Sequence, residues 1–65
     1  MNNTSRVTFL YPRTGSEYIR ECVDGQFCFF EREWAGARWR PAPSTPELMA
    51  EAEKQARVDR ARMAS

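Results

Sequence analysis

The chain has 65 residues, with nine acidic and ten basic side chains and no histidine. A chain of this length forms at most one small domain, which buries only about 60% of the surface that its unfolded form exposes. The formal charge of +1 at pH 7 provides no global attraction to nucleic acid or to an anionic membrane, and no apolar stretch is long enough to span a bilayer.

Residues 6–11 (RVTFLY) predict the first strand, because β-branched and aromatic side chains dominate them and Pro12 follows. Residues 12–16 are turn formers and predict the first connection. The N-terminal residues lack a basic leader followed by a long apolar core, so no signal peptide is predicted. We therefore expect a cytoplasmic protein, in the producing or host cell, whose two thiols are reduced.

Residues 17–23 and 26–34 predict the second and third strands, joined by Asp24-Gly25. An Asp-Gly pair between apolar runs favours a two-residue type I′ turn, because both central residues need positive φ. This turn predicts four cross-strand pairs: Val23 with Gln26, Glu21 with Cys28, Ile19 with Phe30, and Glu17 with Arg32.

Ala35-Gly36 predicts a second reversal, although alanine is a poor residue for a type I′ turn and a bulged loop is an alternative. A tight turn there predicts two pairs of opposite charge, Glu33 with Arg38 and Glu31 with Arg40. Residues 41–43 (PAP) are expected to end the sheet, because proline has no amide proton to donate to a neighbouring strand.

The segment 44–47 (STPE) predicts a helix start, with Ser44 and Glu47 as a capping box and Pro46 in the first turn. Strong helix formers continue from Pro46 to about Met63. Glu53 and Arg57 have the favourable i, i+4 order. The helix carries one thin apolar stripe at helical spacing, which either packs closely on the sheet or relies on a second protein chain: Leu48, Met49, Ala52, Ala56 and Met63.

These elements predict an α+β fold, in which a small antiparallel meander of three or four strands (residues 6–40) is followed by one C-terminal helix (residues 45–63) in a single domain (residues 1–65). Strand alternation divides the side chains between two faces. The face that we expect to form the core carries Ile19, Val23, Cys28, Phe30, Trp34, Ala37 and Trp39.

The opposite face combines aromatic and arginine side chains, which are enriched at protein–protein hot spots and at single-stranded nucleic-acid sites. We predict that this face binds a partner. The alternative is that the first strand or the helix covers it, which would make Phe27 and Phe29 ordinary core residues. The candidate partner-binding residues are Tyr18, Arg20, Phe27, Phe29, Arg38 and Arg40.

The remaining reactive side chains do not predict chemistry. Cys22 and Cys28 lack the further cysteine or histidine ligands of a zinc site, and in the two-residue-turn register they point to opposite faces. A turn longer by one residue would allow a cross-strand disulfide. The glutamates of the sheet are predicted to be solvated or paired with arginine. We therefore expect no enzyme, no metal and no cofactor.

The segment 24–41 (DGQFCFFEREWAGARWRP) resembles the second half of a WW domain, through Asp24-Gly25, the aromatic run at Phe29-Phe30, and Trp39 followed by Pro41. The resemblance implies a β-meander. The positions of the family's proline-binding groove depart from its pattern, because the aromatic partner of Trp39 is replaced by a cysteine. The other departures are Glu31, Arg32 and Ala37 for the family's Asn, His and Thr, and Tyr18 for its first tryptophan.

Together these features predict a non-enzymatic protein-binding module, a small regulator or inhibitor of a larger protein or complex. Phage and mobile-element anti-defence proteins, such as anti-CRISPR proteins, are one class of this size. One alternative is a nucleic-acid-binding module that uses Phe27, Phe29, Arg20, Arg38 and Arg40. The other is a structural homodimer formed through the helix stripe or the exposed sheet face.

Overall fold

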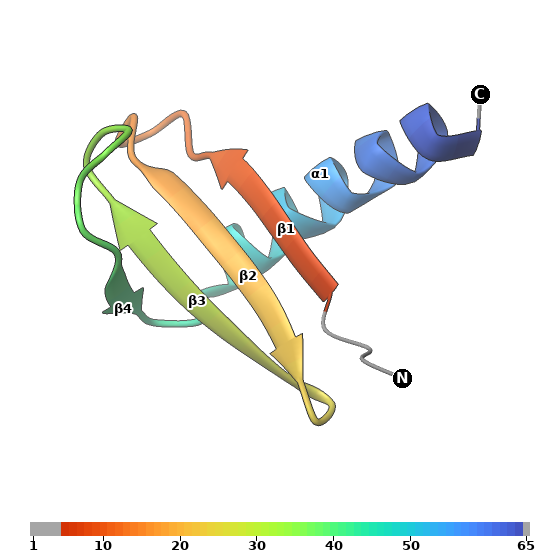
Figure 1. Ribbon diagram of the computed structural model, residues 1–65, viewed down its shortest axis with the longest axis horizontal. Coiled ribbons are helices and arrows are strands. Elements are labelled where there is room, and N and C mark those ends of the chain that lie inside the picture. The colour runs from red at the N-terminus through yellow and green to blue at the C-terminus, as the bar shows by residue number, and fades with distance from the viewer. Residues whose placement is uncertain (1–4, 65) are drawn as a thin grey trace.

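A computed structural model describes residues 5–64. Four antiparallel strands form a meander in the order β1-β2-β3-β4, and one helix crosses a single face of the sheet (Figure 1). This architecture confirms the predicted α+β fold. The elements are β1 (Ser5–Leu10), β2 (Glu17–Val23), β3 (Gln26–Arg32), β4 (Arg40–Ala42) and α1 (Pro46–Ala64).

The β2–β3 hairpin has the predicted two-residue turn. Asp24 and Gly25 have φ values of 53° and 79°, as a type I′ turn requires. All four predicted cross-strand pairs are present. The hairpin register is therefore confirmed, and with it the division of β2 and β3 side chains between two faces.

Strand β1 pairs with β2 so that Val7 lies opposite Arg20 and Phe9 lies opposite Tyr18. The intervening loop is closed by backbone hydrogen bonds, in which the Tyr11 amide donates to the Ser16 carbonyl (3.0 Å) and the Gly15 amide donates to the Tyr11 carbonyl (2.8 Å). This register places Val7 and Phe9 on the face that carries Tyr18 and Arg20.

The β3–β4 connection is longer than predicted. Strand β3 ends at Arg32 and β4 begins at Arg40, although the pairing of Glu31 with Arg40 follows the predicted register. Within the loop the Ala37 amide donates to the Trp34 carbonyl (3.0 Å), and Gly36 takes a φ of 94°. A type I′ turn at Ala35-Gly36 requires a positive φ at both residues. Ala35 does not adopt one, so the pairing of β3 with β4 does not continue through this loop.

The charge pairing at this loop also differs from the prediction. Arg40 approaches Glu33 at 3.9 Å, so Glu33 is paired with Arg40 rather than with Arg38. The sheet continues through Pro41 to Ala42, two residues beyond the predicted end at residue 40. Pro41 is tolerated in β4 because this strand is at the edge of the sheet.

Helix α1 is capped by Thr45 and not, as predicted, by Ser44. The Thr45 carbonyl accepts the first helical hydrogen bond from the Met49 amide (3.0 Å), and its Oγ1 accepts from the Leu48 amide (3.2 Å). Pro46 then occupies the first helical position and disfavours helical geometry in the residue before it. These constraints make Thr45 the last non-helical residue.

Helix α1 covers the face that we predicted to bind a partner. The structure therefore follows the alternative, in which the helix covers this face and Phe29 becomes a core residue. The core consists of Val7, Phe9, Tyr18, Phe29, Leu48, Ala52 and Ala56. The predicted core face, with Ile19, Phe30 and Trp39, has no helix over it (Figure 1). The prediction of the core face is therefore wrong.

Charge burial explains this choice of face. The uncovered face carries two ion pairs, Arg6–Glu21 and Arg32–Glu17, and a helix packed there would remove four charges from water. On the covered face Arg20 is the buried charged residue, and α1 supplies a carboxylate for it. The β1 register adds two apolar side chains to the same face.

The helical stripe is shorter than predicted. Leu48, Ala52 and Ala56 are buried, whereas Met49 and Met63 are exposed. Met63 is exposed because the C-terminal part of α1 extends beyond β1, past the edge of the sheet (Figure 1). Glu53 pairs with Arg20 across the core and not with Arg57 along the helix.

We predict that Thr45→Ala lowers the free energy of unfolding by about 1 kcal/mol, because the Leu48 amide loses its acceptor. Ser44→Ala is the matched control and should have little effect. Urea unfolding of the two variants and the wild type measures both values. A larger loss for Ser44→Ala than for Thr45→Ala would move the cap back to Ser44.

The close approach of α1 to the sheet generates a second prediction. Ala52 is fully buried, whereas Ala50 lies on the exposed side of the helix. Ala52→Leu should destabilise the fold by about 1–3 kcal/mol through overpacking, and Ala50→Leu should be close to neutral. Thermal unfolding of the two variants compares them, and equal stability would mean that the helix is not seated at Ala52.

Candidate functional site

The six residues predicted to bind a partner do not form one exposed surface. Tyr18, Arg20 and Phe29 lie beneath α1, and Phe29 is only 3% exposed. Phe27 is 41% exposed, and the loop-end residues Arg38 and Arg40 are exposed. The expectation that this set shares an open face is wrong, because α1 packs on it. A role for the exposed members in binding stays a prediction.

Burial also affects the nucleic-acid alternative. Base stacking requires a ring face that is open to solvent, and Phe29 does not offer one. The Arg20 guanidinium is likewise enclosed, with its Cζ 4.2 Å from the centroid of the Phe27 ring. Of the five residues named for that function, Phe27, Arg38 and Arg40 remain accessible.

Arg20 of β2 forms an ion pair with Glu53 of α1 and so links the helix to the sheet. Its Nη1 donates to Glu53 Oε2 at 2.7 Å, and its side chain is 7% exposed, against 49% for Glu53. The hydrogen bond from Arg20 and then the charge of Arg20 hold the pKa of Glu53 below its ordinary value of 4.5. Arg20 Nε is buried without a hydrogen-bond partner, so the Glu53 contact carries most of the compensation for burying this charge.

The side of the sheet opposite α1 has no covering layer and carries accessible apolar side chains, including Leu10 and Val23. We call it the open sheet face. Strand alternation and the observed registers assign to it Arg6, Thr8, Leu10, Glu17, Ile19, Glu21, Val23, Gln26, Cys28, Phe30, Arg32 and Pro41. Trp39, in the β3–β4 loop, lies against the same face, because it lines a hollow together with Ile19 and Phe30.

A shallow hollow of about 230 Å³ lies on the open sheet face. Ile19 and Phe30, which are cross-strand neighbours, line it together with Trp39, and Arg6 and Glu21 form its rim. All three apolar side chains are half-buried. The hollow therefore has an apolar interior and a charged edge, which suits the insertion of an apolar side chain.

Two ion pairs border the apolar side chains of the open sheet face. Arg6 donates to Glu21 Oε2 from Nη2 (2.6 Å) and from Nε (3.0 Å). Arg32 Nε donates to Glu17 Oε1 at 2.6 Å, and the Arg32 Cζ lies 4.4 Å from the centroid of the Trp39 ring. The charges on this face are therefore neutralised in place, and the cation–π contact helps to position Trp39.

Further exposed apolar side chains lie on the open sheet face or in the adjoining β3–β4 loop. Leu10 is 67% exposed on the open sheet face, Val23 is exposed near the hairpin, and Trp34 is exposed in the β3–β4 loop. Contiguous exposed apolar groups with a polar rim are typical of interaction sites.

The potential metal-ligating side chains of the described residues are dispersed. Among residues 5–64 there is no group of three or more His, Cys, Asp or Glu side chains placed to hold a metal ion. Cys22 and Cys28 are free thiols. They lie on opposite faces because the two-residue turn pairs Cys22 with Phe27 and Glu21 with Cys28.

Comparison of the chain with family models, with curated proteins and with solved structures finds no match. Within residues 5–64, no helix combines the length and apolar character needed to cross a membrane.

The sequence did contain signals for the open sheet face. The hairpin register groups Ile19 with Phe30, and the predicted second turn adds Trp39, but the assignment of these three residues to the core is wrong. The opposite-charge pair of Glu17 and Arg32 on the same face is the signal against burial, since a cross-strand pair of charges is costly to desolvate.

The Glu53–Arg20 contact predicts a pH dependence of stability. Because the folded-state pKa of Glu53 is depressed, the contact stabilises the fold above pH 4.5, the ordinary pKa of this carboxyl, and this contribution is lost as the pH falls through the folded-state value. We expect Glu53→Gln to be less stable at pH 7 and to lose less stability on acidification. Urea unfolding between pH 7 and pH 3 measures this.

Glu51→Gln is the matched control, since Glu51 lies one half-turn away and pairs with Lys54 at 3.8 Å. It should retain the wild-type dependence on pH. A Glu53→Gln curve that parallels the wild type would show that the contact does not stabilise the fold.

Proposed function

We propose that the protein is a non-enzymatic binding module whose open sheet face docks on a larger protein, in the manner of a small regulator or inhibitor. Anti-defence proteins of phages and mobile elements, such as anti-CRISPR proteins, are one class consistent with this size. The observation that carries the proposal is a sheet face without a covering layer that retains Ile19, Phe30 and Trp39 around a hollow.

The chemistry of the open sheet face supports a protein partner. Leu10, Val23 and the hollow provide apolar area, and burial of apolar area is the main driving force of protein association. Aromatic side chains such as Phe30 and Trp39 are enriched among hot-spot residues. Because Arg6–Glu21 and Arg32–Glu17 are already paired, docking leaves no uncompensated charge at the centre of the interface.

The size of the molecule sets the size of the contact. The two longest extents are 30 and 26 Å, so one face is comparable to one side of a standard interface of about 800 Å² per partner. A partner that forms an interface of this standard size must therefore use most of the open sheet face. The proposed contact is one broad surface with an apolar side chain in the hollow.

We predict that Ile19→Lys abolishes capture of a protein partner from extracts of the source cell, because it places a charge at the centre of the hollow. Val58→Lys is the matched control, since Val58 is a 41% exposed apolar residue on α1, away from the open sheet face. Circular dichroism verifies that both variants fold, and Leu10→Lys replaces Ile19→Lys if that variant is unfolded. Equal capture by wild type and Ile19→Lys would refute the proposal.

Analytical ultracentrifugation of the same variants separates a larger partner from a second copy of the chain. We expect the wild type and Ile19→Lys to sediment as monomers at all concentrations. A wild-type dimer that Ile19→Lys dissociates would assign the open sheet face to self-association. Capture that depends on nuclease-sensitive material and falls steeply with salt would assign it to nucleic acid.

A further inference from the structure

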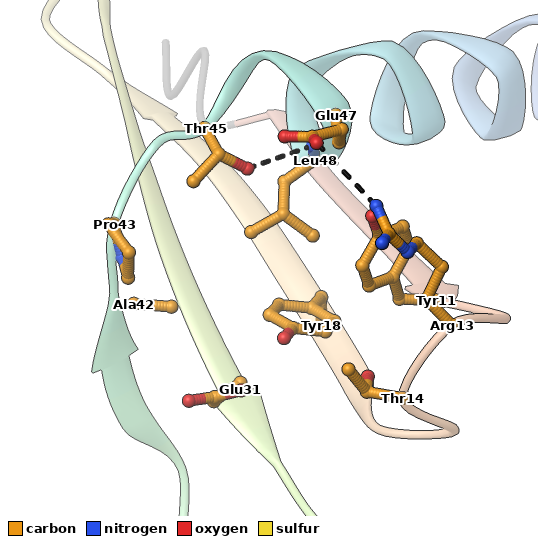
Figure 2. Close-up of a pocket in the computed structure, with 10 residues that line it drawn as sticks. All are labelled: Tyr11, Arg13, Thr14, Tyr18, Glu31, Ala42, Pro43, Thr45, Glu47 and Leu48. Carbon is orange, nitrogen blue, oxygen red and sulfur yellow. Dashed lines mark hydrogen bonds and ion pairs between the residues drawn. The ribbon is translucent and has the colours of Figure 1, made fainter.

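A second and larger hollow lies on the other side of the sheet, where α1 begins. Its volume is about 550 Å³, which is within the range of small-molecule sites. Tyr11, Tyr18, Glu31 and Leu48 line its interior, with Arg13 and Glu47 at its mouth (Figure 2). We call it the tyrosine pocket.

Aromatic rings form the wall of the tyrosine pocket. Tyr18 and Leu48 are buried, and Tyr11 is half-buried. The Tyr11 and Tyr18 rings meet edge to face, with centroids 6.0 Å apart and planes at 84°. Such an arrangement offers both apolar area and the negative face of a ring, which attracts a cation.

Glu31 supplies the negative charge inside the pocket. The carboxylate is half-buried, and Figure 2 shows it on the wall of the pocket that β3 forms, beside Tyr18. Its cross-strand neighbour Arg40 approaches Glu33 instead, at 3.9 Å. Among the described residues none forms an ion pair with Glu31, so its charge is not neutralised by a basic side chain.

Glu31 also acts on the neighbouring phenol of Tyr18. The pKa of Tyr18 is raised, first by burial and then by hydrogen bonding to Glu31 and by the charge of that carboxylate. Tyr18 therefore stays a neutral phenol near pH 7.

The charged residues at the mouth of the pocket do not cancel the negative charge of Glu31. Arg13 and Glu47 face each other there at 3.7 Å, with side chains 73% and 60% exposed, so they neutralise one another weakly and can separate. The three charged lining residues sum to −1, from Arg13, Glu31 and Glu47. The negative charge of Glu31 also lies deeper in the pocket than the exposed Arg13–Glu47 pair.

The start of α1 does not favour an anion in this pocket. The Leu48 amide, which would otherwise be free to bind an anion, already donates to Thr45 Oγ1 (Figure 2). Glu47 adds a negative charge in the first helical turn, which opposes the positive end of the helix dipole. Both features disfavour an anion, and the charge of Glu47 favours a positively charged ligand.

We propose that the tyrosine pocket binds an organic cation, a guanidinium or alkylammonium group, with Glu31 as the charge partner and the Tyr11 and Tyr18 rings against its alkyl part. The cation belongs either to an arginine or lysine side chain of a protein or to a free small molecule. The pocket lies across the sheet from the open sheet face, so this proposal does not depend on the proposed docking surface.

The test is an NMR titration of the ¹⁵N-labelled chain with butylguanidine and, in parallel, with butylurea, its neutral isostere. We expect saturable shifts at the amides of Tyr11, Thr14, Tyr18 and Leu48 with butylguanidine and much smaller ones with butylurea. Glu31→Gln retains a hydrogen-bond acceptor but loses the charge, and it should weaken butylguanidine binding by about tenfold or more.

Glu51→Gln is the matched control, because Glu51 is a half-buried carboxylate on α1 that does not line the pocket, and it should bind as the wild type does. If Glu31→Gln is unfolded by circular dichroism, Tyr11→Leu serves the same purpose. Unchanged binding by the folded pocket variant would overturn the proposal. So would equal binding of butylurea, tighter binding of methyl phosphate at the same amides, or shifts confined to other surfaces.

A capped Ala-Arg-Ala peptide distinguishes the two sources of the cation. Tighter binding of the peptide than of butylguanidine would assign the pocket to an arginine side chain of a protein, and equal or weaker binding would assign it to a free small molecule. Ile19→Lys should leave both titrations unchanged, so a failure of the open sheet face as a docking surface does not affect the outcome here.

Discussion

The cost of burying charge decides which face of this small sheet the helix covers, and the other properties follow from that choice. One face holds two cross-strand ion pairs, Arg6–Glu21 and Arg32–Glu17, which remain solvated when the face stays open. The other face holds Arg20, and α1 brings Glu53 to it. Covering the second face removes fewer charges from water and leaves Ile19, Phe30 and Trp39 accessible to a partner.

Local signals in the sequence were sufficient for the elements and for one register. Asp24-Gly25 fixed the β2–β3 hairpin because its turn type requires two positive φ values, and the observed pairs agree. Pro46 marked the start of the helix, although the cap moved by one residue to Thr45. The β3–β4 turn was predicted less well, since Ala35-Gly36 lacks the same conformational preference.

The covered face could not be predicted from the hairpin alone. Val7 and Phe9 decide the apolar balance between the two faces, and they join the face of Tyr18 only through the β1–β2 register. That register depends on the loop at residues 11–16, whose length and backbone hydrogen bonds have no strong sequence signature. The tyrosine pocket was missed for the same reason, because Tyr11, Glu31 and Leu48 meet only after the helix is placed. Neighbouring residues of β3 thus serve opposite sides: Phe30 lines the hollow of the open sheet face, whereas Glu31 lines the tyrosine pocket.

The most direct test of this arrangement is a ¹³C-edited NOESY spectrum of the chain in solution, focused on the methyl groups of Ala52 and Ala56. The account predicts cross-peaks from these methyl groups to side chains of the core face, including the rings of Phe9 and Phe29, and none to Ile19, Phe30 or Trp39. Cross-peaks to Phe30 and Trp39 would place the helix on the opposite face and contradict the account.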